Sequence, residues 1–253
     1  MKLVALISGG KDCIYNMMQC IDKGDEISCL VNMCPQPGSK PHVESKMFQM
    51  VGSEATPYIG QALGNLPLYR KEISGNVINH EVEYVPTEGD EVEDLFYLLT
   101  AVIQENPEIK GVSCGYLKSQ YQKNRLQSIC TRLDLKMVCH LWGLDSISLL
   151  DDMIFDEVNA IIIRIASPYL SSKFLGQSIK ECRDNLLEVR NKHNDFSVAG
   201  EENVYDTFVL DCPIYKYRIA IITSEAILSG RDAPIPIHTL KLVNYDLILK
   251  PEE

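Results

Sequence analysis

The densest group of chemically useful side chains lies near the amino end of the chain. It comprises Ser8, Gly9, Gly10, Lys11 and Asp12 in an unbroken row. Two adjacent glycines allow a sharp bend that turns backbone N–H groups toward an anion. The serine offers a hydroxyl, the lysine a full charge, and the aspartate a helix cap or a metal ligand. The row therefore predicts a phosphate-binding loop.

The flanking sequence supplies the elements that such a loop needs. Residues 2–7 begin with a lysine and continue as an unbroken apolar run over 3–7, which is typical of a central parallel strand. Residues 11–21 have the pattern of an amphipathic helix, whose dipole adds positive potential at the loop. The pattern is neither the Walker loop nor the dinucleotide glycine motif. A strand-turn-helix with two packing glycines remains the structural alternative.

Strand and helix patterns alternate through the first half of the chain. After the first pair, strands are expected at 27–33, 68–73, 109–114 and 136–141, and helices at 89–104 and 118–133. Helical spacing also runs through 44–63, where Gly52 and Pro57 are expected to divide it. This order predicts an α/β fold with a parallel Rossmann-like (HUP-type) sheet and helices on both faces. Segments 8–12 and 36–41 and Gly115 would meet at the carboxyl edge of the sheet, where ligands bind.

The regular alternation of strand and helix patterns ends near residue 144. Helices at 148–156 and 179–193 and strands at 160–165, 205–210, 217–223 and 239–249 indicate a second, smaller region of mixed α/β structure. We therefore predict an ATP-binding domain at 1–143 and a substrate-binding domain at 144–253. No internal repeat is present.

Composition narrows the class of function. The formal net charge of −11 disfavours nucleic acid as a main partner, because phosphate backbones attract basic surfaces. The nine cysteines contain no Cys-x-x-Cys pair and lie mostly in apolar runs, a pattern typical of a reduced cytoplasmic protein. No apolar run is long enough to span a membrane, and no signal peptide is evident.

Ser-Gly-Gly-Lys-Asp resembles the pyrophosphate loop of the ATP pyrophosphatases, which adenylate their substrates. The whole chain is similar to one family among them, the diphthine–ammonia ligases. The likeness is carried by four blocks: Ser8 to Gln19; Pro86 to Leu95; Tyr121 to Arg125 with Cys130 to Leu133 and Leu141-Trp142; and Gly200-Glu201 with Tyr205 to Thr207 and Leu210 to Pro213.

The resemblance implies an activity. ATP would convert the carboxylate of diphthine, a modified histidine on translation elongation factor 2, into an acyl-adenylate, which ammonium would convert to the amide. ATP and Mg²⁺ are the implied cofactors, and neither a membrane nor a nucleic acid is an expected partner. Lys11, Asp12 and Glu201 would be catalytic, with Asp12 also the metal ligand.

The remaining assignments follow from the same resemblance. The nucleotide would meet Ser8, Gly9, Gly10, Lys11, Asp12, Cys13 and Gly115, with Cys13 a passive replacement for serine. The substrate would meet Glu88, Asp90, Glu91, Gln122, Arg125, Glu201, Tyr205, Asp206 and Thr207. From the residues alone, the acidic group at 88–91 is equally a solvated helix start. Arg125 is equally a partner for a nearby carboxylate.

The fourth block departs from the family pattern Gly-Glu-x-Gly-Glu-Tyr/Phe-Glu-Thr. Asn203 replaces a glycine and tolerates the same left-handed backbone. Val204 replaces a glutamate and can neither hold a cation nor accept a proton, so restoring that glutamate would raise turnover if the carboxylate mattered. Two alternatives therefore stand: another adenylating enzyme that modifies tRNA, and a nucleotide-binding module that has lost catalysis.

Overall fold

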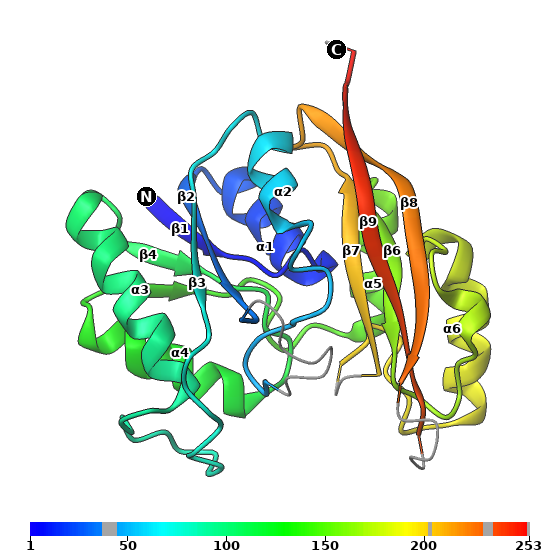
Figure 1. Ribbon diagram of the computed structural model, residues 1–253, viewed down its shortest axis with the longest axis horizontal. Coiled ribbons are helices and arrows are strands. Elements are labelled where there is room, and N and C mark those ends of the chain that lie inside the picture. Colours follow the sequence, from blue (N-terminus) through cyan, green and yellow to red (C-terminus); the bar gives the residue numbers. More distant parts are fainter. Residues whose placement is uncertain (37–44, 202–203, 230–234, 252–253) are drawn as a thin grey trace.

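The computed structural model describes residues 1–36, 45–201, 204–229 and 235–251. Two sheets stand side by side with helices between and around them (Figure 1). Part of the loop predicted at 36–41, and the residues Glu202 and Asn203, lie outside the described residues. Within the described residues, none of the helices combines the length and apolar character that crossing a bilayer requires.

The first sheet is parallel, as predicted, and has the order β3-β2-β1-β4-β5. Its strands are β1 (Lys2–Leu6), β2 (Glu26–Cys34), β3 (Leu68–Glu72), β4 (Gly111–Ser113) and β5 (Lys136–Val138). Its helices are α1 (Lys11–Asp22), α2 (Thr56–Ala62), α3 (Glu91–Glu105) and α4 (Gln120–Arg132). The chain order reverses between β1 and β4, and ligands bind parallel sheets at such a switch point.

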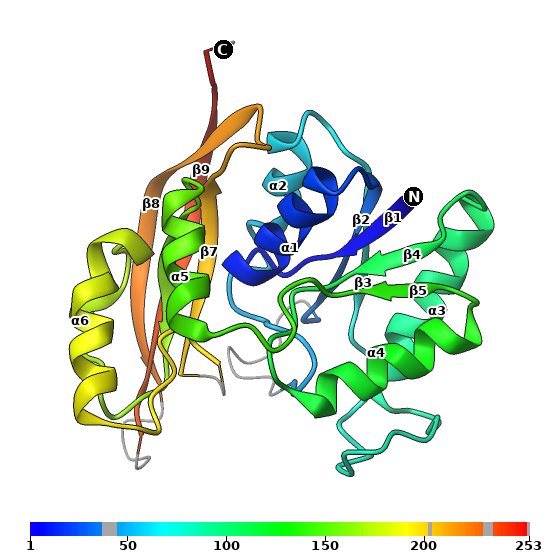
Figure 2. The ribbon, with the colours of Figure 1, turned by 180° about the vertical axis from the view of Figure 1, so that it is seen from behind.

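Helices cover both faces of this sheet, which confirms the predicted α/β class. Apolar side chains of α1 and α2 belong to one core cluster, and those of α3 and α4 belong to another on the opposite face. The two faces are visible in Figures 1 and 2. Strand β1 supplies both clusters because its side chains alternate between the faces: Ala5 joins the first, and Val4 and Leu6 join the second.

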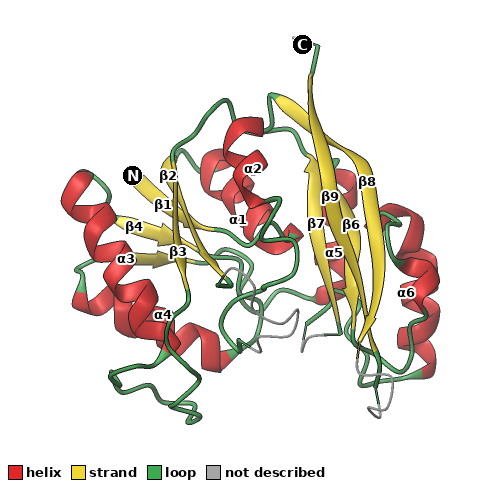
Figure 3. Ribbon diagram, in the orientation of Figure 1, coloured by secondary structure: helices red, strands yellow, loops and turns green. Residues whose placement is uncertain are grey.

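The second sheet is antiparallel and has the order β7-β6-β9-β8. Its strands are β6 (Asn159–Ile165), β7 (Tyr205–Asp211), β8 (Tyr217–Ser229) and β9 (Ile237–Leu249). The helices of this half are α5 (Ser146–Phe155), the 3-10 turn η1 (Ser172–Phe174) and α6 (Ile179–Lys192). Helices α1 and α2 lie between the two sheets, and α6 lies on the far side of the second sheet (Figure 3).

The two halves share one apolar core. A single cluster joins Ile14 and Met17 of α1 to Phe208 of β7 and Met153 of α5. The Tyr15 hydroxyl also donates to the carboxylate of Asp156, just beyond α5, at 2.6 Å. Helix α1 therefore packs against both halves and fixes how they are positioned relative to each other. The division at 143/144 into independent domains stays a prediction.

The segment at 44–63 is helical over a shorter stretch than its spacing predicts. Residues 51–55 form turns, and α2 begins only at Thr56. Pro57 therefore lies in the first turn of the helix, where its missing N–H leaves no hydrogen bond unmade. The segment at 45–51 consequently has an irregular backbone, and it forms one wall of the cavity described below.

Candidate active site

A cavity of about 860 Å³ opens at the carboxyl edge of the first sheet, on the side that faces β7. Residues from both halves line it, including Ser8, Gly10, Asp12, Cys13, Gly115, Lys118, Gln122, Arg164, Glu201 and Asp206. Ligand pockets in proteins have volumes of about 300–1,000 Å³, so the cavity has room for a nucleotide. It lies beside β1 and β4, at the switch point of the sheet.

The loop Ser8–Asp12, the phosphate loop hereafter, forms one end of this cavity. Gly10 is the N-cap of α1, has no side chain to cap the helix, and lines the cavity, so this end of α1 faces the cavity. Gly9 has a φ of +94°, and a Cβ there would lie 2.7 Å from the ring of Phe208. The loop is open to an anion on one side and tightly packed on the other.

Strand β7 holds the phosphate loop from behind. The Val209 amide donates to the Gly9 carbonyl at 2.9 Å, and the Lys11 amide donates to the Thr207 hydroxyl at 3.0 Å. Tyr205 is buried, and its hydroxyl donates to the Val198 carbonyl at 2.5 Å. Thr207 and Tyr205, predicted to meet the substrate, therefore lie behind the phosphate loop and are not among the residues that line the cavity.

Lys11 has a different position from the one we predicted. Its ammonium is buried and donates to both oxygens of Asp12, at 2.9 and 3.0 Å, and to the Ala199 carbonyl at 2.5 Å. It also lies 5.7 Å from the centre of the Tyr205 ring. These partners direct the charge toward the carboxyl-terminal half, so Lys11 is not among the residues lining the cavity. It positions Asp12.

Three carboxylates, the acidic cluster, meet at the cavity: Asp12, Glu201 and Asp206. Burial raises the pKa of Asp12, and the charges of Glu201 and Asp206 raise it further while Lys11 opposes them. Burial also raises the pKa of Asp206, which Arg164 opposes from 3.2 Å. Carboxylates held together against these costs are a common arrangement around a cation.

The hydrogen bonding of Glu201 also suggests a binding site for a cation or for a substrate group. One carboxylate oxygen accepts from the Ser197 hydroxyl at 3.1 Å and lies 3.4 Å from the ammonium of Lys118. The other oxygen is buried and has no hydrogen-bond partner among the described residues. A hard cation such as Mg²⁺ prefers oxygen ligands, and the acidic cluster offers ligands of that type.

Gly115 lies in the cavity wall for a reason of packing. A Cβ at this position would lie 2.3 Å from the Asp12 carbonyl carbon and 2.4 Å from the Cys13 amide nitrogen. The loop after β4 therefore presses directly on the first turn of α1. Cys13 donates its thiol to the Gly10 carbonyl at 3.0 Å, and burial raises its pKa, so the sulfur remains a thiol. This agrees with a passive replacement for serine.

Glu88 and Asp90 are not among the residues that line the cavity. Glu88 is exposed. Asp90 caps α3 by accepting from the Val92 amide, and its second oxygen accepts from the amides of Ile78 and Asn79. Asp90 therefore caps α3 and organises the loop before it, but its side chain is buried, so it is not the solvated helix start stated as the alternative.

Glu91 is buried against the cavity wall, although it does not line the cavity itself. Its carboxyl is bonded by the Ser45 hydroxyl and by the amides of Lys46 and Met47, while burial raises its pKa. Its other oxygen is buried without a hydrogen-bond partner among the described residues. Glu91 thus fixes the segment that closes one side of the cavity.

Gln122 and Arg125 separate in space although they share a helix. Gln122 lines the cavity and donates to the Lys46 carbonyl at 3.2 Å. Arg125 is fully buried, donates to the carbonyls of Asn79, Glu81 and Tyr121, and stacks 3.2 Å above the Tyr121 ring. Its guanidinium holds the loop around residues 79–84 and is not among the residues lining the cavity. We therefore leave Arg125 out of the site.

The sequence analysis did not predict four basic residues that line the cavity: Lys46, Lys118, Arg164 and Arg190. Lys118 follows β4 and Arg164 lies near the end of β6, so each stands close to the carboxyl end of a strand. Lys118 could have been predicted as a site residue, because it follows a predicted strand and ligands bind at the carboxyl ends of such strands. The pairing of Arg164 with Asp206 depends on the register of β6 with β7, which the sequence does not specify.

Two family models match the chain: the diphthamide synthase N-terminal domain over residues 1–137 and the diphthamide synthase C-terminal domain over residues 145–241. The chain belongs to the diphthamide synthase family. A diphthine–ammonia ligase of Mus musculus is 41% identical over 250 residues, which cover 98% of this chain and 92% of the mouse protein. The Homo sapiens relative of the same name is 39% identical, with the same two coverages.

Relatives of this family also occur as longer chains. A diphthine–ammonia ligase of Schizosaccharomyces pombe is 41% identical over 90% of this chain, which spans only 37% of the length of that protein. Among solved structures, a predicted subunit of tRNA methyltransferase from Methanocaldococcus jannaschii aligns with a TM-score of 0.35 and 15% identity, covering 84% of this chain and 98% of its own. That likeness is too weak to support a conclusion.

Val204 is one of the two positions at which we expected a departure from the family pattern. Its side chain packs against the shared apolar core, and its carbonyl accepts from the Ala166 amide at 3.0 Å. It is not among the residues that line the cavity. The structure therefore favours a packing role for this side chain.

We accordingly expect Val204→Glu to leave turnover unchanged or lower and to destabilise the fold by about 1–3 kcal/mol, because a carboxylate would displace an apolar contact. Thermal unfolding beside a turnover assay checks this. Val204→Thr, which keeps the branched shape without a charge, is the matched control. A rise in turnover for the glutamate variant would place that carboxylate in the reaction.

Proposed function

We propose that this chain is an ATP-dependent ligase that converts the carboxylate of diphthine on translation elongation factor 2 to the amide, with ammonium as the nitrogen source. The observation that carries the proposal is the phosphate loop and the acidic cluster facing one cavity, inside a member of the diphthamide synthase family. The free state of all nine cysteines supports a cytoplasmic setting.

The cavity divides into parts that suit the parts of ATP. Its wall at the strand ends is apolar, with Ile7, Met33 and Phe48, and suits a purine ring. The phosphate loop and the amide end of α1 suit the β- and γ-phosphates. Mg²⁺, held by Asp12 with Asp206 or Glu201, would neutralise the charge that collects on departing pyrophosphate.

Adenylation then needs the substrate carboxylate in line with the α-phosphorus. The carboxylate oxygen forms a bond to that phosphorus while the bond to the pyrophosphate oxygen breaks. The phosphate-loop amides stabilise the leaving group, because they are already oriented and do not reorganise as charge develops. Lys118, half-exposed at the cavity beside Glu201, is available to attract the incoming carboxylate.

Amidation follows in the same cavity. Ammonia attacks the acyl carbon, AMP leaves with the electron pair of the broken C–O bond, and the nitrogen gives up a proton. Glu201 is our choice for the base, because one of its oxygens has no hydrogen-bond partner among the described residues. The carboxylates around it also suit an ammonium ion before it is deprotonated.

Glu201→Gln should separate these two half-reactions. We expect ATP–pyrophosphate exchange to stay within a few fold of the parent and amide formation to fall by about 100-fold or more, since the amide side chain cannot accept the proton. Exchange and amide yield are measured on the same preparation. Glu181→Gln, in the first turn of α6 and outside the cavity, is the control. Equal losses in both steps would make Glu201 a binding residue instead.

Lys11→Ala should move the pH dependence of adenylation. Lys11 lowers the pKa of Asp12, so removing its charge raises that pKa, and the ionised carboxylate is then present only at higher pH. The acidic limb of the rate profile should therefore shift upward in pH. Lys192→Ala, on the exposed face of α6, should leave it in place. An unshifted limb with a uniformly low rate would instead indicate a direct phosphate contact.

The overall function is tested by incubating the chain with ATP, ammonium and elongation factor 2 that carries diphthine. We expect AMP and the amide to form together, with mass spectrometry reporting the change at the modified histidine. The reaction without ammonium and a factor that already carries the amide are the controls. ATP binding without AMP release under all conditions would overturn the proposal and favour a nucleotide-binding module.

A further inference from the structure

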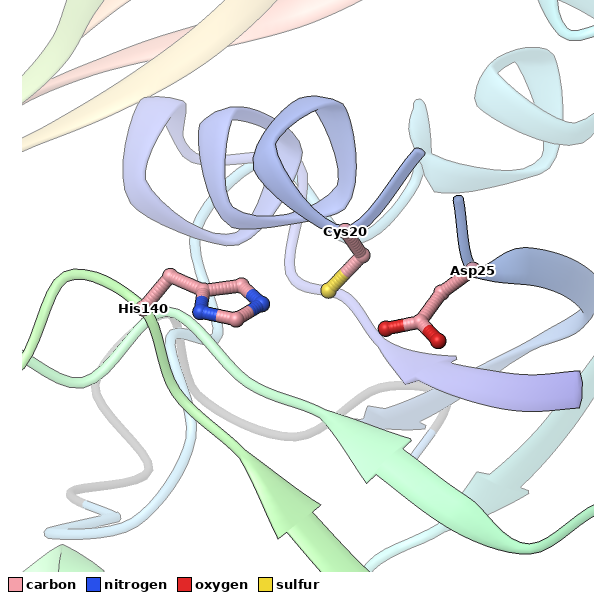
Figure 4. Close-up of side chains that lie close together, drawn as sticks. All are labelled: Cys20, Asp25 and His140. Carbon is pink, nitrogen blue, oxygen red and sulfur yellow. The ribbon is translucent and has the colours of Figure 1, made fainter. Parts of the chain in front are cut away.

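A second group of chemically active side chains lies at the other end of α1 from the phosphate loop. Cys20 stands in the last turns of α1, Asp25 in the turn before β2, and His140 just beyond β5 (Figure 4). One ligand atom from each lies within 4.8 Å of the other two. We call these three residues the Cys-Asp-His cluster. Nothing in the proposed ligase reaction uses it.

Burial shapes the chemistry of the cluster. Cys20 is completely buried, and its thiol has only long contacts, 3.6 Å to the Ser113 hydroxyl and 3.7 Å from the Asn16 amide. The Nε2 atom of His140 is buried and has no hydrogen-bond partner among the described residues. An imidazole nitrogen without such a partner can offer its lone pair to a metal ion.

We propose that Cys20, Asp25 and His140 bind a zinc ion. Thiolate, imidazole and carboxylate are the ligands that zinc takes in proteins, and three protein ligands leave a fourth position for water. One thiolate and one carboxylate balance the charge of a divalent ion, and the terminal ammonium of Met1 lies beside Asp25 as a further positive charge. Binding releases the thiol proton of Cys20 to solvent.

The geometry requires a modest adjustment. Ligand atoms around a tetrahedral zinc are about 3.3–3.5 Å apart, so the cluster must contract by about 1 Å. Asp25 keeps its ion pair with the terminal amine of Met1 through Oδ1, at 2.6 Å, and so retains its second oxygen for the metal. Asp25 also lines a surface cleft of about 350 Å³, whereas Cys20 and His140 do not.

Zinc at this position would join three segments that are distant in sequence. It would tie the end of α1 to the α1–β2 turn and to the loop after β5. The His140 amide already donates to Asn16 of α1 at 2.7 Å, so the loop is aligned with the helix before any metal binds. We therefore expect the metal to stabilise the first sheet without taking part in adenylation.

Cobalt(II) tests the proposal, because a cobalt–thiolate bond gives a charge-transfer absorption that oxygen and nitrogen ligands do not. We titrate metal-free full-length chain with cobalt in excess Mg²⁺, which occupies oxygen-only sites. One equivalent of cobalt should produce the thiolate band, and one equivalent of zinc should abolish it. Cys20→Ser should remove the band, and His140→Gln should weaken metal binding by about 10-fold or more.

Two controls separate this site from other thiols. Cys13→Ser should keep the band, although Cys13 lies beside Asp12 in the proposed nucleotide site. Cys182→Ser, at an equally buried thiol of α6, should also keep it. Should Cys20→Ser fail to fold, the cobalt affinity of His140→Gln tests the proposal instead, because His140 is only half-buried. Absence of the band in the parent chain, or equal metal affinity in His140→Gln, would overturn the proposal, whatever the ligase assay shows.

Discussion

Replacing Asp12 with asparagine should reduce ATP–pyrophosphate exchange by about 100- to 1,000-fold while the chain remains folded. Asp12 is the only member of the acidic cluster that lies on the phosphate loop itself, at the first turn of α1. An amide cannot neutralise a cation that bridges the phosphates, and it leaves charge on departing pyrophosphate uncompensated. The exchange assay at saturating Mg²⁺, together with circular dichroism, measures both expectations.

Asp22→Asn is the matched control, because Asp22 is an exposed residue at the opposite end of the same helix. It should retain the exchange rate of the parent chain. If Asp12→Asn exchanged pyrophosphate at the parent rate, the cation would have to be held by Glu201 and Asp206 alone, and the assignment of Asp12 would be wrong.

Replacing Gly115 with alanine should abolish ATP binding and destabilise the fold by about 3 kcal/mol or more. The added Cβ would lie within 2.5 Å of backbone atoms of Asp12 and Cys13, and backbone has no flexible end that can yield. The first turn of α1 would have to move, and the phosphate loop would move with it. Calorimetric titration with ATP and urea unfolding report the two effects.

Gly143→Ala is the control for this change. Gly143 has a φ of +78°, and its added Cβ would meet nothing within 4 Å, so only the backbone strain of about 1–2 kcal/mol is expected there. ATP binding should survive. Normal ATP affinity in Gly115→Ala would show that the loop after β4 can withdraw and that its contact with α1 is not required.

Local pattern was enough to predict the architecture of the first sheet. Residues 3–7 are apolar on both faces of the strand, which is typical of a covered parallel strand, and the glycines after them permit the sharp turn. Helix α3 could be placed because its apolar spacing and its cap, Asp90, are neighbours in the sequence. The structure of the segment at 45–55 could not be predicted. Its apolar residues have helical spacing, but packing against the rest of the fold leaves it as bends and turns.

The sequence by itself determined the sheet, the position of the phosphate loop and the family, because each depends on residues close together in the chain. Tertiary structure decided where the charged side chains point. Lys11 turns from the cavity to Asp12 and the Ala199 carbonyl, and Arg125 turns to backbone carbonyls around residue 80. A buried charge takes the partners that surround it, and for both residues those partners include groups far away in the sequence.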